Sequence, residues 1–522
     1  MNAKPHTGDA PPARENRGQA RRHWLTLLLA SLLVQGLMYL SYPLGAANFD
    51  DNQAAQTYML GELAEGNLLI GNVRYNTGYA FIMSPFWTLT RAIGRLGDRL
   101  FLLLQMTAYG AIPFLVYDML RRRFDRRCAL ITALVVLLDP FALQWSHLRL
   151  PGWLIALTAV GALWLAQLAW AAPQRRRFAL IAIAAVGLGI MSVARYNFAP
   201  LVAVFGVGFV MWRHIPWRER FALFALVGLL SGGILGAYTL LIHLPSTGVT
   251  ALSCISAFRA VQSLHEKDVY PRASNGPNSA EYARLLALPS ANPRENYLDS
   301  AKFALWSIPE GWLGEAEKQA FLAGQPGDIQ DEIATDFPAN LYWYLGPCEV
   351  DRLLAGLLRE TVAADLWQYA RGVIGATVSS LAQNPADARF DYMYLDRYED
   401  MTWRGENLLG FQAADSTLYN GHRLWRPGAA LFSALFTPWN AIKFLTPLAL
   451  IAAIWRRDWL LICAAALLLT CLALLATFSG IEPRYYAIVA PLYSILIGWF
   501  LAQIAGRVSP DTEPPQPDSN SP

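Results

Sequence analysis

Charged side chains are scarce in this sequence. Asp, Glu, Lys and Arg make up 16% of its 522 residues, and hydrophobic residues make up 54%. The mean hydropathy is +0.27. Soluble domains carry about 25% charged residues, so this composition excludes an ordinary soluble chain. The net charge is only +3, and the chain therefore lacks the basic excess with which nucleic-acid-binding proteins contact phosphates. We expect no nucleic-acid partner.

Cysteine is also rare, with five residues and no CxxC or other metal-ligand spacing. Cys128, Cys463 and Cys471 lie in or beside apolar runs. Cys254 and Cys348 lie in polar sequence and can either form a disulfide or act as small buried apolar residues; the sequence leaves both alternatives open. Alternating strand patterns are nearly absent as well. These absences favour an all-α fold without a structural metal.

Long apolar runs dominate what is present. A helix needs about 20 apolar residues to cross a bilayer, and about ten runs approach or reach that length. They are Trp24–Gly45, Leu100–Leu120, Ala129–Trp145, Trp153–Ala171, Phe178–Ala194, Phe198–Trp212, Phe221–Leu244, Ala429–Trp455, Trp459–Phe478 and Tyr485–Ile504. We therefore predict a polytopic transmembrane helix bundle of about ten spans.

The distribution of arginine predicts the orientation of the spans. Four arginines precede the first span, which places the N-terminus in the cytoplasm. The segment Gly78–Ile93 is ambiguous, because counting it as a span would place Arg121–Arg127 outside. Treating it as a re-entrant or juxtamembrane helix puts three further basic loops in the cytoplasm, at Gln174–Arg177, Trp212–Arg220 and Arg456–Arg457.

This register divides the chain into five regions. Residues 1–23 and 507–522 are predicted to be disordered tails. Residues 24–244 form an N-terminal transmembrane module with a first outer loop at 46–98. Residues 245–428 form a mostly helical extracytoplasmic insert, and residues 429–506 form a C-terminal transmembrane module.

The outer face collects ionisable and aromatic residues close to the membrane, where charge is costly and commonly functional. The adjacent carboxylates Asp50 and Asp51 follow the first span. The other residues are Arg74, Tyr75, His147, Arg149, Arg195, Tyr196, Asn197, Glu482, Arg484 and Tyr485. A carboxylate pair at such a place can hold a metal or take a proton from a hydroxyl. It can equally place negative charge at the start of the next helix, Asn52–Glu65.

The order of these features resembles the GT-C superfamily of membrane glycosyltransferases. It is most similar to the branch with dolichyl-phosphate-mannose protein mannosyltransferases and the lipid A aminoarabinose transferase. The similar features are Asp50-Asp51 with Tyr58, Tyr75 to Tyr79, Ser146 to Arg149, Ala194-Arg195-Tyr196, and Glu482-Pro483-Arg484-Tyr485. Gly152 departs from the pattern where the family often has an acid, and Asp51 replaces a longer Glu. The insert 245–428 matches nothing in the pattern.

The resemblance implies an inverting glycosyltransferase that moves a sugar from a polyprenyl-phosphate donor to a glycan, lipid or protein acceptor. It implies a place in the bacterial inner membrane with a periplasmic active site. Asp50 would be the base and Asp51 an orienting residue or metal ligand; a divalent metal is possible but not required. Arg149, Arg195 and Arg484 with Tyr485 would bind the donor phosphate. Tyr58, Arg74, Tyr75, Tyr196 and Glu482 would contact substrate.

Other interpretations stay open. Arg149 and Arg195 can be membrane-boundary anchors, and Glu482 can simply neutralise Arg484. Asp139, which precedes a proline inside a predicted span, can mark a helix break. The rival functions are an O-antigen ligase or polymerase and a transporter or flippase of lipid-linked sugar. A transporter would place its charges at mid-membrane, whereas these charges gather at one face.

Overall fold

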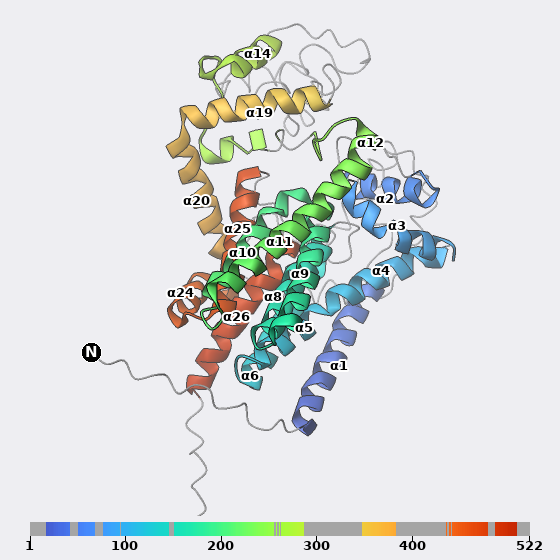
Figure 1. Cartoon of the computed structure of the whole chain (residues 1–522), viewed down its shortest axis with the longest axis vertical. Helices are drawn as coiled ribbons and strands as arrows, with labels where there is room; N and C mark the ends of the chain where they lie inside the picture. Colours follow the sequence, from blue (N-terminus) through green and yellow to red (C-terminus); the bar gives the residue numbers. More distant parts are fainter. Residues whose placement is uncertain are drawn as a thin grey trace, which may run out of the picture.

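The computed structural model describes residues 17–41, 51–67, 77–93, 95–145, 151–254, 257, 260–261, 263–286, 347–382, 435, 438–439, 441–478 and 486–508. Within these ranges every regular element is a helix, which confirms the all-α fold (Figure 1). The α-helices are α1 (Arg17–Ser41), α2 (Asp51–Ala64), α3 (Gly78–Arg91), α4 (Arg95–Gly110), α5 (Ile112–Arg121), α6 (Arg126–Leu137), α7 (Pro140–Trp145), α8 (Gly152–Trp170), α9 (Gln174–Ala194), α10 (Pro200–Val207), α11 (Trp217–Tyr238), α12 (Leu244–Thr247), α14 (Pro277–Leu286), α19 (Pro347–Ala364), α20 (Leu366–Ala382), α24 (Thr446–Arg456), α25 (Trp459–Phe478) and α26 (Tyr486–Val508).

Six helical segments of the described chain are long and apolar enough to cross a membrane. They are Leu103–Arg121, Gly152–Trp170, Gln174–Ala194, Trp217–Thr247, Trp459–Phe478 and Ile488–Gly506. All six overlap runs that the sequence predicts as spans. The predicted total of about ten spans stays a prediction.

The bundle is built from neighbouring antiparallel helices that the C-terminal helix closes. α9 packs against α8 on one side and α11 on the other, and α26 packs against α6, α7 and α8. One hydrophobic core therefore contains residues of both modules, including Leu163 of α8 and Leu496 of α26.

The predicted span Ala129–Trp145 is interrupted at Asp139, as the sequence indicates. α6 ends at Leu137 and α7 begins at Pro140. The Asp139 side chain is buried, with 1% exposed. Its Oδ1 accepts a hydrogen bond from the Ala142 amide at 3.2 Å, and its Oδ2 accepts one from Ser494 Oγ of α26 at 2.6 Å. The carboxylate thus satisfies an amide that the break frees and ties α7 to α26.

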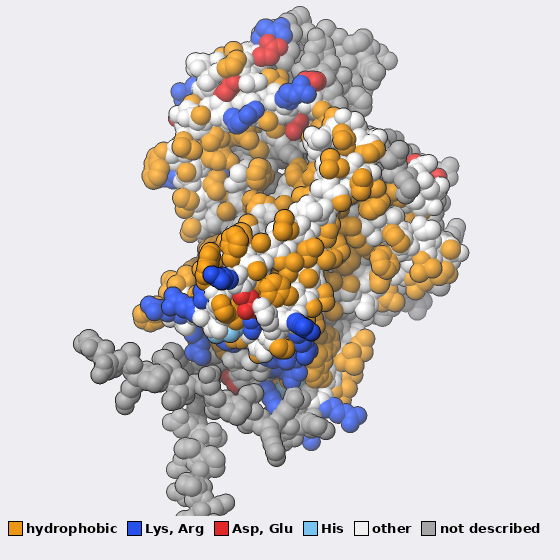
Figure 2. All heavy atoms as spheres, viewed as in Figure 1, with side chains coloured by type: hydrophobic (Ala, Val, Ile, Leu, Met, Phe, Trp, Pro, Cys, Tyr) orange, Lys and Arg blue, Asp and Glu red, His pale blue; other side chains and the backbone are white. Residues whose placement is uncertain are grey.

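Four arginine-bearing turns meet at one end of the bundle, which we call the basic end. Arg123 Nε donates to Asp458 Oδ2 at 2.6 Å, and Arg177 forms an ion pair with Glu219. Figure 2 shows Lys and Arg side chains gathered toward the lower end of the bundle. The loops predicted to be cytoplasmic therefore lie together, as one common orientation of the spans requires.

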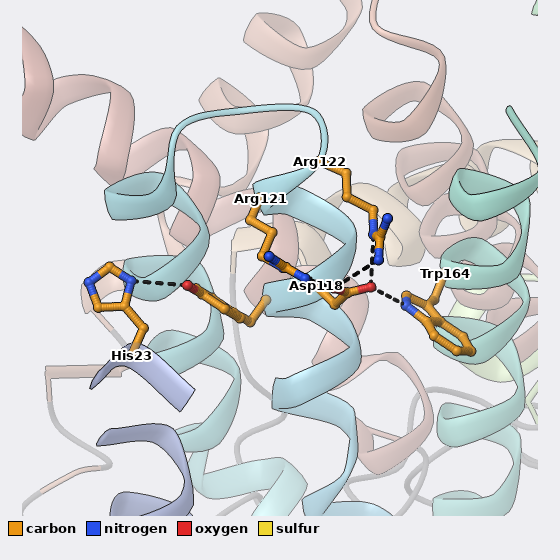
Figure 3. A network of polar contacts seen from close by, with 6 residues as sticks. His23, Asp118, Arg121, Arg122 and Trp164 are labelled. Carbon is orange, nitrogen blue, oxygen red and sulfur yellow. Dashed lines mark hydrogen bonds and ion pairs between the residues drawn. The ribbon is translucent and has the colours of Figure 1, made fainter. Parts of the chain in front are cut away.

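Buried polar contacts fix the helices just inside this end. Asp118 of α5 accepts hydrogen bonds from Arg121 at the end of its own helix, from the following Arg122 and, at 2.9 Å, from Trp164 Nε1 of α8 (Figure 3). His23 of α1 shares a hydrogen bond with the neighbouring Tyr117 hydroxyl at 3.0 Å. One short stretch of α5 thus positions both α1 and α8.

The ambiguous segment Gly78–Ile93 folds as α3, a helix of 14 residues. At 1.5 Å per residue it extends about 21 Å, which is shorter than the hydrocarbon core of a bilayer. It packs against α2 and α4, and Figure 1 shows α2 and α3 as a short pair beside the long helices. This agrees with its interpretation as a helix that does not span.

The described parts of the insert are helical and have a core of their own, which includes Tyr282, Val350 and Leu354. Glu360 of α19 accepts hydrogen bonds from the amides and side chains of Asn278 and Ser279 at the start of α14. Desolvation raises the pKa of this carboxyl, but the hydrogen bonds outweigh it and lower the pKa to about 2.

A disulfide joins Cys254 to Cys348, 94 residues apart in sequence. The sequence left this pairing open. It attaches the first turn of α19 to the segment that follows α12. Cys128, Cys463 and Cys471 are free and buried.

We predict that maleimide-polyethylene glycol adds three labels to the protein unfolded in SDS without reductant, because three thiols are free. After reduction it adds five, one for each cysteine. Labels are counted as steps in gel mobility. Cys348→Ser is the control, since it frees Cys254 and leaves every remaining cysteine reactive without reductant. Five labels on the unreduced wild type would contradict the pairing.

Candidate active site

The start of α3 contacts three other elements at the end of the bundle opposite the basic end. Thr77 Oγ1 and the Tyr238 hydroxyl, at the end of α11, share a hydrogen bond of 2.6 Å. Trp153 Nε1, at the start of α8, donates to the Tyr79 hydroxyl at 3.4 Å. Between Thr77 and Tyr79, Gly78 lies against the end of α9. We call Thr77, Gly78 and Tyr79 the α3 hub.

Only glycine fits at position 78. A Cβ atom there would lie 2.0 Å from the carbonyl oxygen of Val193, a backbone atom that cannot move aside as a flexible side chain can. The missing side chain therefore lets the α3 backbone approach the last turn of α9. Arg195 follows two residues after this contact.

Arg195 leaves α9 in an extended conformation, with φ −155° and ψ 96°. The next residue, Tyr196, opens a short 3-10 helix (Tyr196–Phe198) and hydrogen-bonds Ser253. Ser253 directly precedes the disulfide-bonded Cys254. The arginine is therefore held at the point where the bundle, the α3 hub and the disulfide-bonded part of the insert come together.

The first turn of α19 covers this point. Asp351 of α19 accepts a hydrogen bond from the Ala257 amide at 2.8 Å, and its charge acts on Tyr196. The tyrosine hydroxyl thus contacts the insert, a contact that the sequence did not indicate. Tyr196 links the insert to the end of α9.

α2 packs along α3 and buries Met59, Leu60 and Leu63. α2 begins at Asp51, within one residue of the predicted helix Asn52–Glu65. A carboxylate at that place can stabilise the helix N-terminus, so both interpretations of Asp51 stay open.

The described residues include only part of the predicted site. Arg195 and Tyr196 are described in full. Asp51 and Tyr58 lie in α2, but their side chains are outside what the structure describes. The other predicted site residues are also outside the described ranges; they are Asp50, Arg74, Tyr75, Arg149, Glu482, Arg484 and Tyr485. Their roles stay predictions. In the described ranges no three His, Cys, Asp or Glu side chains form a group that could hold a metal.

The structure also joins residues that sequence reasoning missed. The Thr77–Tyr238 and Tyr196–Ser253 contacts bring together positions 161 and 57 residues apart, and no local pattern marks them. Lys443, by contrast, had a signal. It is the single charged residue in the predicted span Ala429–Trp455, and it is buried with its Nζ 4.7 Å from the ring centroid of Tyr493.

A comparison with protein families supports one functional class for this chain. Residues 79–235 match the sequence model of the family described as "Dolichyl-phosphate-mannose-protein mannosyltransferase". The match begins in the α3 hub and ends in α11, so it includes Trp153, Val193 and Arg195. The matched segment, less than half of the chain, thus resembles a family of the GT-C superfamily of membrane glycosyltransferases. This confirms the resemblance and indicates a transferase.

Two solved structures resemble the fold of this chain at 15% sequence identity. One is the oligosaccharyltransferase AglB from Archaeoglobus fulgidus in complex with an inhibitory peptide and a dolichol-phosphate, with a TM-score of 0.43. The other is an oligosaccharyltransferase from the same organism tethered with an acceptor peptide, with a TM-score of 0.42. Each match covers 92% of this chain and 50% of the other, so the chain spans about half their length. None of the curated proteins matches the chain.

We predict that Gly78→Ala lowers the thermal unfolding midpoint in detergent, because the added methyl group must push the α3 hub away from Val193. Such overpacking costs about 1–3 kcal/mol. Gly161→Ala in α8 is the matched control, since nothing lies within 4 Å of a Cβ there. Equal midpoints for the two variants would contradict the close approach.

Proposed function

We propose that this protein is an inverting glycosyltransferase that moves a sugar from a polyprenyl-phosphate donor to an acceptor hydroxyl at the outer face of the bacterial inner membrane. The observation that carries the proposal is the α3 hub. At the beginning of the segment that matches the mannosyltransferase family, Tyr79 of α3 contacts Trp153 of α8, and the preceding Gly78 lies against the end of α9 close to Arg195.

Two independent features favour the outer face. The arginine-bearing turns at the basic end favour the cytoplasmic side, which leaves the α3 hub on the opposite side. The disulfide Cys254–Cys348 is part of the same opposite end, and disulfides form and persist in oxidising compartments such as the bacterial periplasm.

The proposed reaction requires cations beside the donor phosphate. Two of the three predicted phosphate-binding arginines are close in sequence to residues that contact the α3 hub. Arg195 lies two residues after Val193, Arg149 lies four residues before Trp153, and Arg484 precedes α26 by two residues. Guanidinium binds phosphate well because its fork reaches two oxygens and keeps its charge. Tyr485 would donate a further hydrogen bond.

The acidic pair would act on the acceptor. Asp50 takes the proton of the acceptor hydroxyl, and the oxygen then attacks the anomeric carbon from the face opposite the phosphate. The bond from that carbon to the phosphate oxygen breaks, and the polyprenyl phosphate leaves with the electron pair. Asp51 orients Asp50 or holds a divalent ion. Tyr58, Arg74, Tyr75, Tyr196 and Glu482 would line the place of the sugar and acceptor.

We predict that Asp50→Asn abolishes transfer while the protein stays folded, because the amide has nearly the same shape but cannot accept the proton. Loss of a general base costs about 10²–10⁴-fold in rate. The measurement is release of polyprenyl phosphate from a panel of polyprenyl-phosphate monosaccharides. Asp365→Asn, in the turn between α19 and α20, is the matched control. A variant that keeps more than about a tenth of wild-type turnover would show that Asp50 is not a base.

We predict that Arg195→Lys weakens binding of sugar-free polyprenyl phosphate, because lysine lacks the fork that reaches two phosphate oxygens. Arg484→Lys should do the same, and the losses in the double variant should be non-additive because both groups act on one phosphate. Arg213→Lys, on the exposed turn at the basic end, is the control. Unchanged affinity in both single variants would leave these arginines as membrane anchors.

A further inference from the structure

α20 has the character of a membrane helix although it lies in the segment that the sequence assigns to the outer insert. Its 17 residues contain one charge, Arg371, near its first turns. The following 11 residues, Gly372 to Ala382, are all uncharged. Figure 1 shows α20 turning down from α19 and running beside α25 toward α24.

Two hydrogen bonds fix how far α20 reaches along the bundle. Near its start, the Tyr369 hydroxyl donates to the carbonyl of Thr477, the penultimate residue of α25, at 3.3 Å. Near its end, the Ser380 carbonyl accepts from the Tyr493 hydroxyl of α26 at 2.6 Å. Ser380 follows Tyr369 by eleven positions in the helix, so α20 descends about 16 Å from the outer end of α25. It therefore lies at the level of the spans.

The outward face of α20 is apolar at this level. Trp367, Ile374 and Val378 are 79%, 60% and 57% exposed, and their spacing places them on one side of the helix. Water-facing helices carry polar residues on such a face. Trp367 and Arg371 at the outer end are the residue types that mark a membrane boundary.

α24 continues this face where α20 ends. Lys443, just before α24, contacts the ring of Tyr493, the same residue whose hydroxyl binds the end of α20. α24 then runs for 11 residues to Arg456 at the basic end, with Leu448, Ile451 and Trp455 exposed. The two helices extend about 25 Å and 16 Å, so each alone is shorter than the hydrocarbon core of a bilayer.

We propose that α20 lies in the bilayer beside α24, with Ile374 and Val378 against lipid acyl chains and Trp367 at the outer membrane boundary. Lipid is the occupant of this face because α20 packs along α25, itself long and apolar enough to cross. The apolar face is also continuous with that of α24. The membrane part of the second module then begins at Leu366, and the outer insert is shorter than the sequence predicts.

The inner end of α20 meets the demand that lipid makes on a helix that ends within the bilayer, namely that backbone polar groups find partners within the protein. Tyr493 satisfies the Ser380 carbonyl. Lys443 is 2% exposed, and the charge of Asp139, itself 1% exposed, acts on it. The polar groups beside the inner end of α20 thus face the protein interior and not the lipid-facing side.

Site-directed spin labelling of the full chain in lipid nanodiscs tests this placement, which does not depend on the proposed transferase activity. Ile374→Cys and Val378→Cys are labelled after Cys128, Cys463 and Cys471 are replaced by alanine, with the disulfide kept. Apolar oxygen and a water-soluble nickel chelate are compared as relaxing agents. The controls are Ile451→Cys on α24 for lipid and Arg284→Cys on α14 for water.

We expect both α20 labels to match Ile451→Cys, with strong relaxation by oxygen and little by the nickel chelate. Relaxation by the chelate as strong as at Arg284→Cys would show that α20 faces water and would overturn the proposal. Weak relaxation by both agents would overturn it too, because protein would then cover the face, either from residues 383–434 or from a second copy. Folding of each variant is checked by its elution in size-exclusion chromatography.

Discussion

The close approach of Gly78 to Val193 is the constraint on which the candidate site depends. It lets α3 begin in contact with the end of α9, and the flanking residues then reach further elements. Thr77 contacts Tyr238 of α11, and Tyr79 contacts Trp153 of α8. Any side chain at position 78 would separate α3 from α9 and leave Arg195 without a neighbouring helix start. The arrangement of the candidate site thus depends on the absence of a side chain at Gly78.

Polar contacts between the two modules give this arrangement a rigid frame. Buried charges are costly unless they are paired and hydrogen-bonded. The buried carboxylates of this frame have such partners. Asp139 binds Ser494 across 355 residues, and Arg123 binds Asp458 across 335 residues. One contact lies inside the bundle and the other at the basic end. Together with the shared core they hold α26 and α25 against the N-terminal helices.

The sequence predicts the helical class, the grouping of basic turns and the break at Asp139, because each follows from a local pattern. Apolar length marks a helix, arginine clusters mark a side, and proline after aspartate marks an end. The site follows less well. The sequence indicates Arg195 as a cation at a helix end, but not that Tyr196 binds Ser253 or that Thr77 binds Tyr238. Such pairs depend on how distant helices pack, which a single sequence does not encode locally.

The position of α20 is likewise not predictable from its local sequence pattern. Its sequence has 17 residues with one charge, a length between that of a surface helix and that of a full span, so periodicity alone cannot place it. The partners of its two ends are what distinguish these cases. Tyr369 binds the outer end of α25, whereas Ser380 binds the interior of α26. Because a helix has a fixed rise per residue, two anchors at different depths determine its path. A short apolar helix in a polar segment is therefore placed by its contacts and not by its composition.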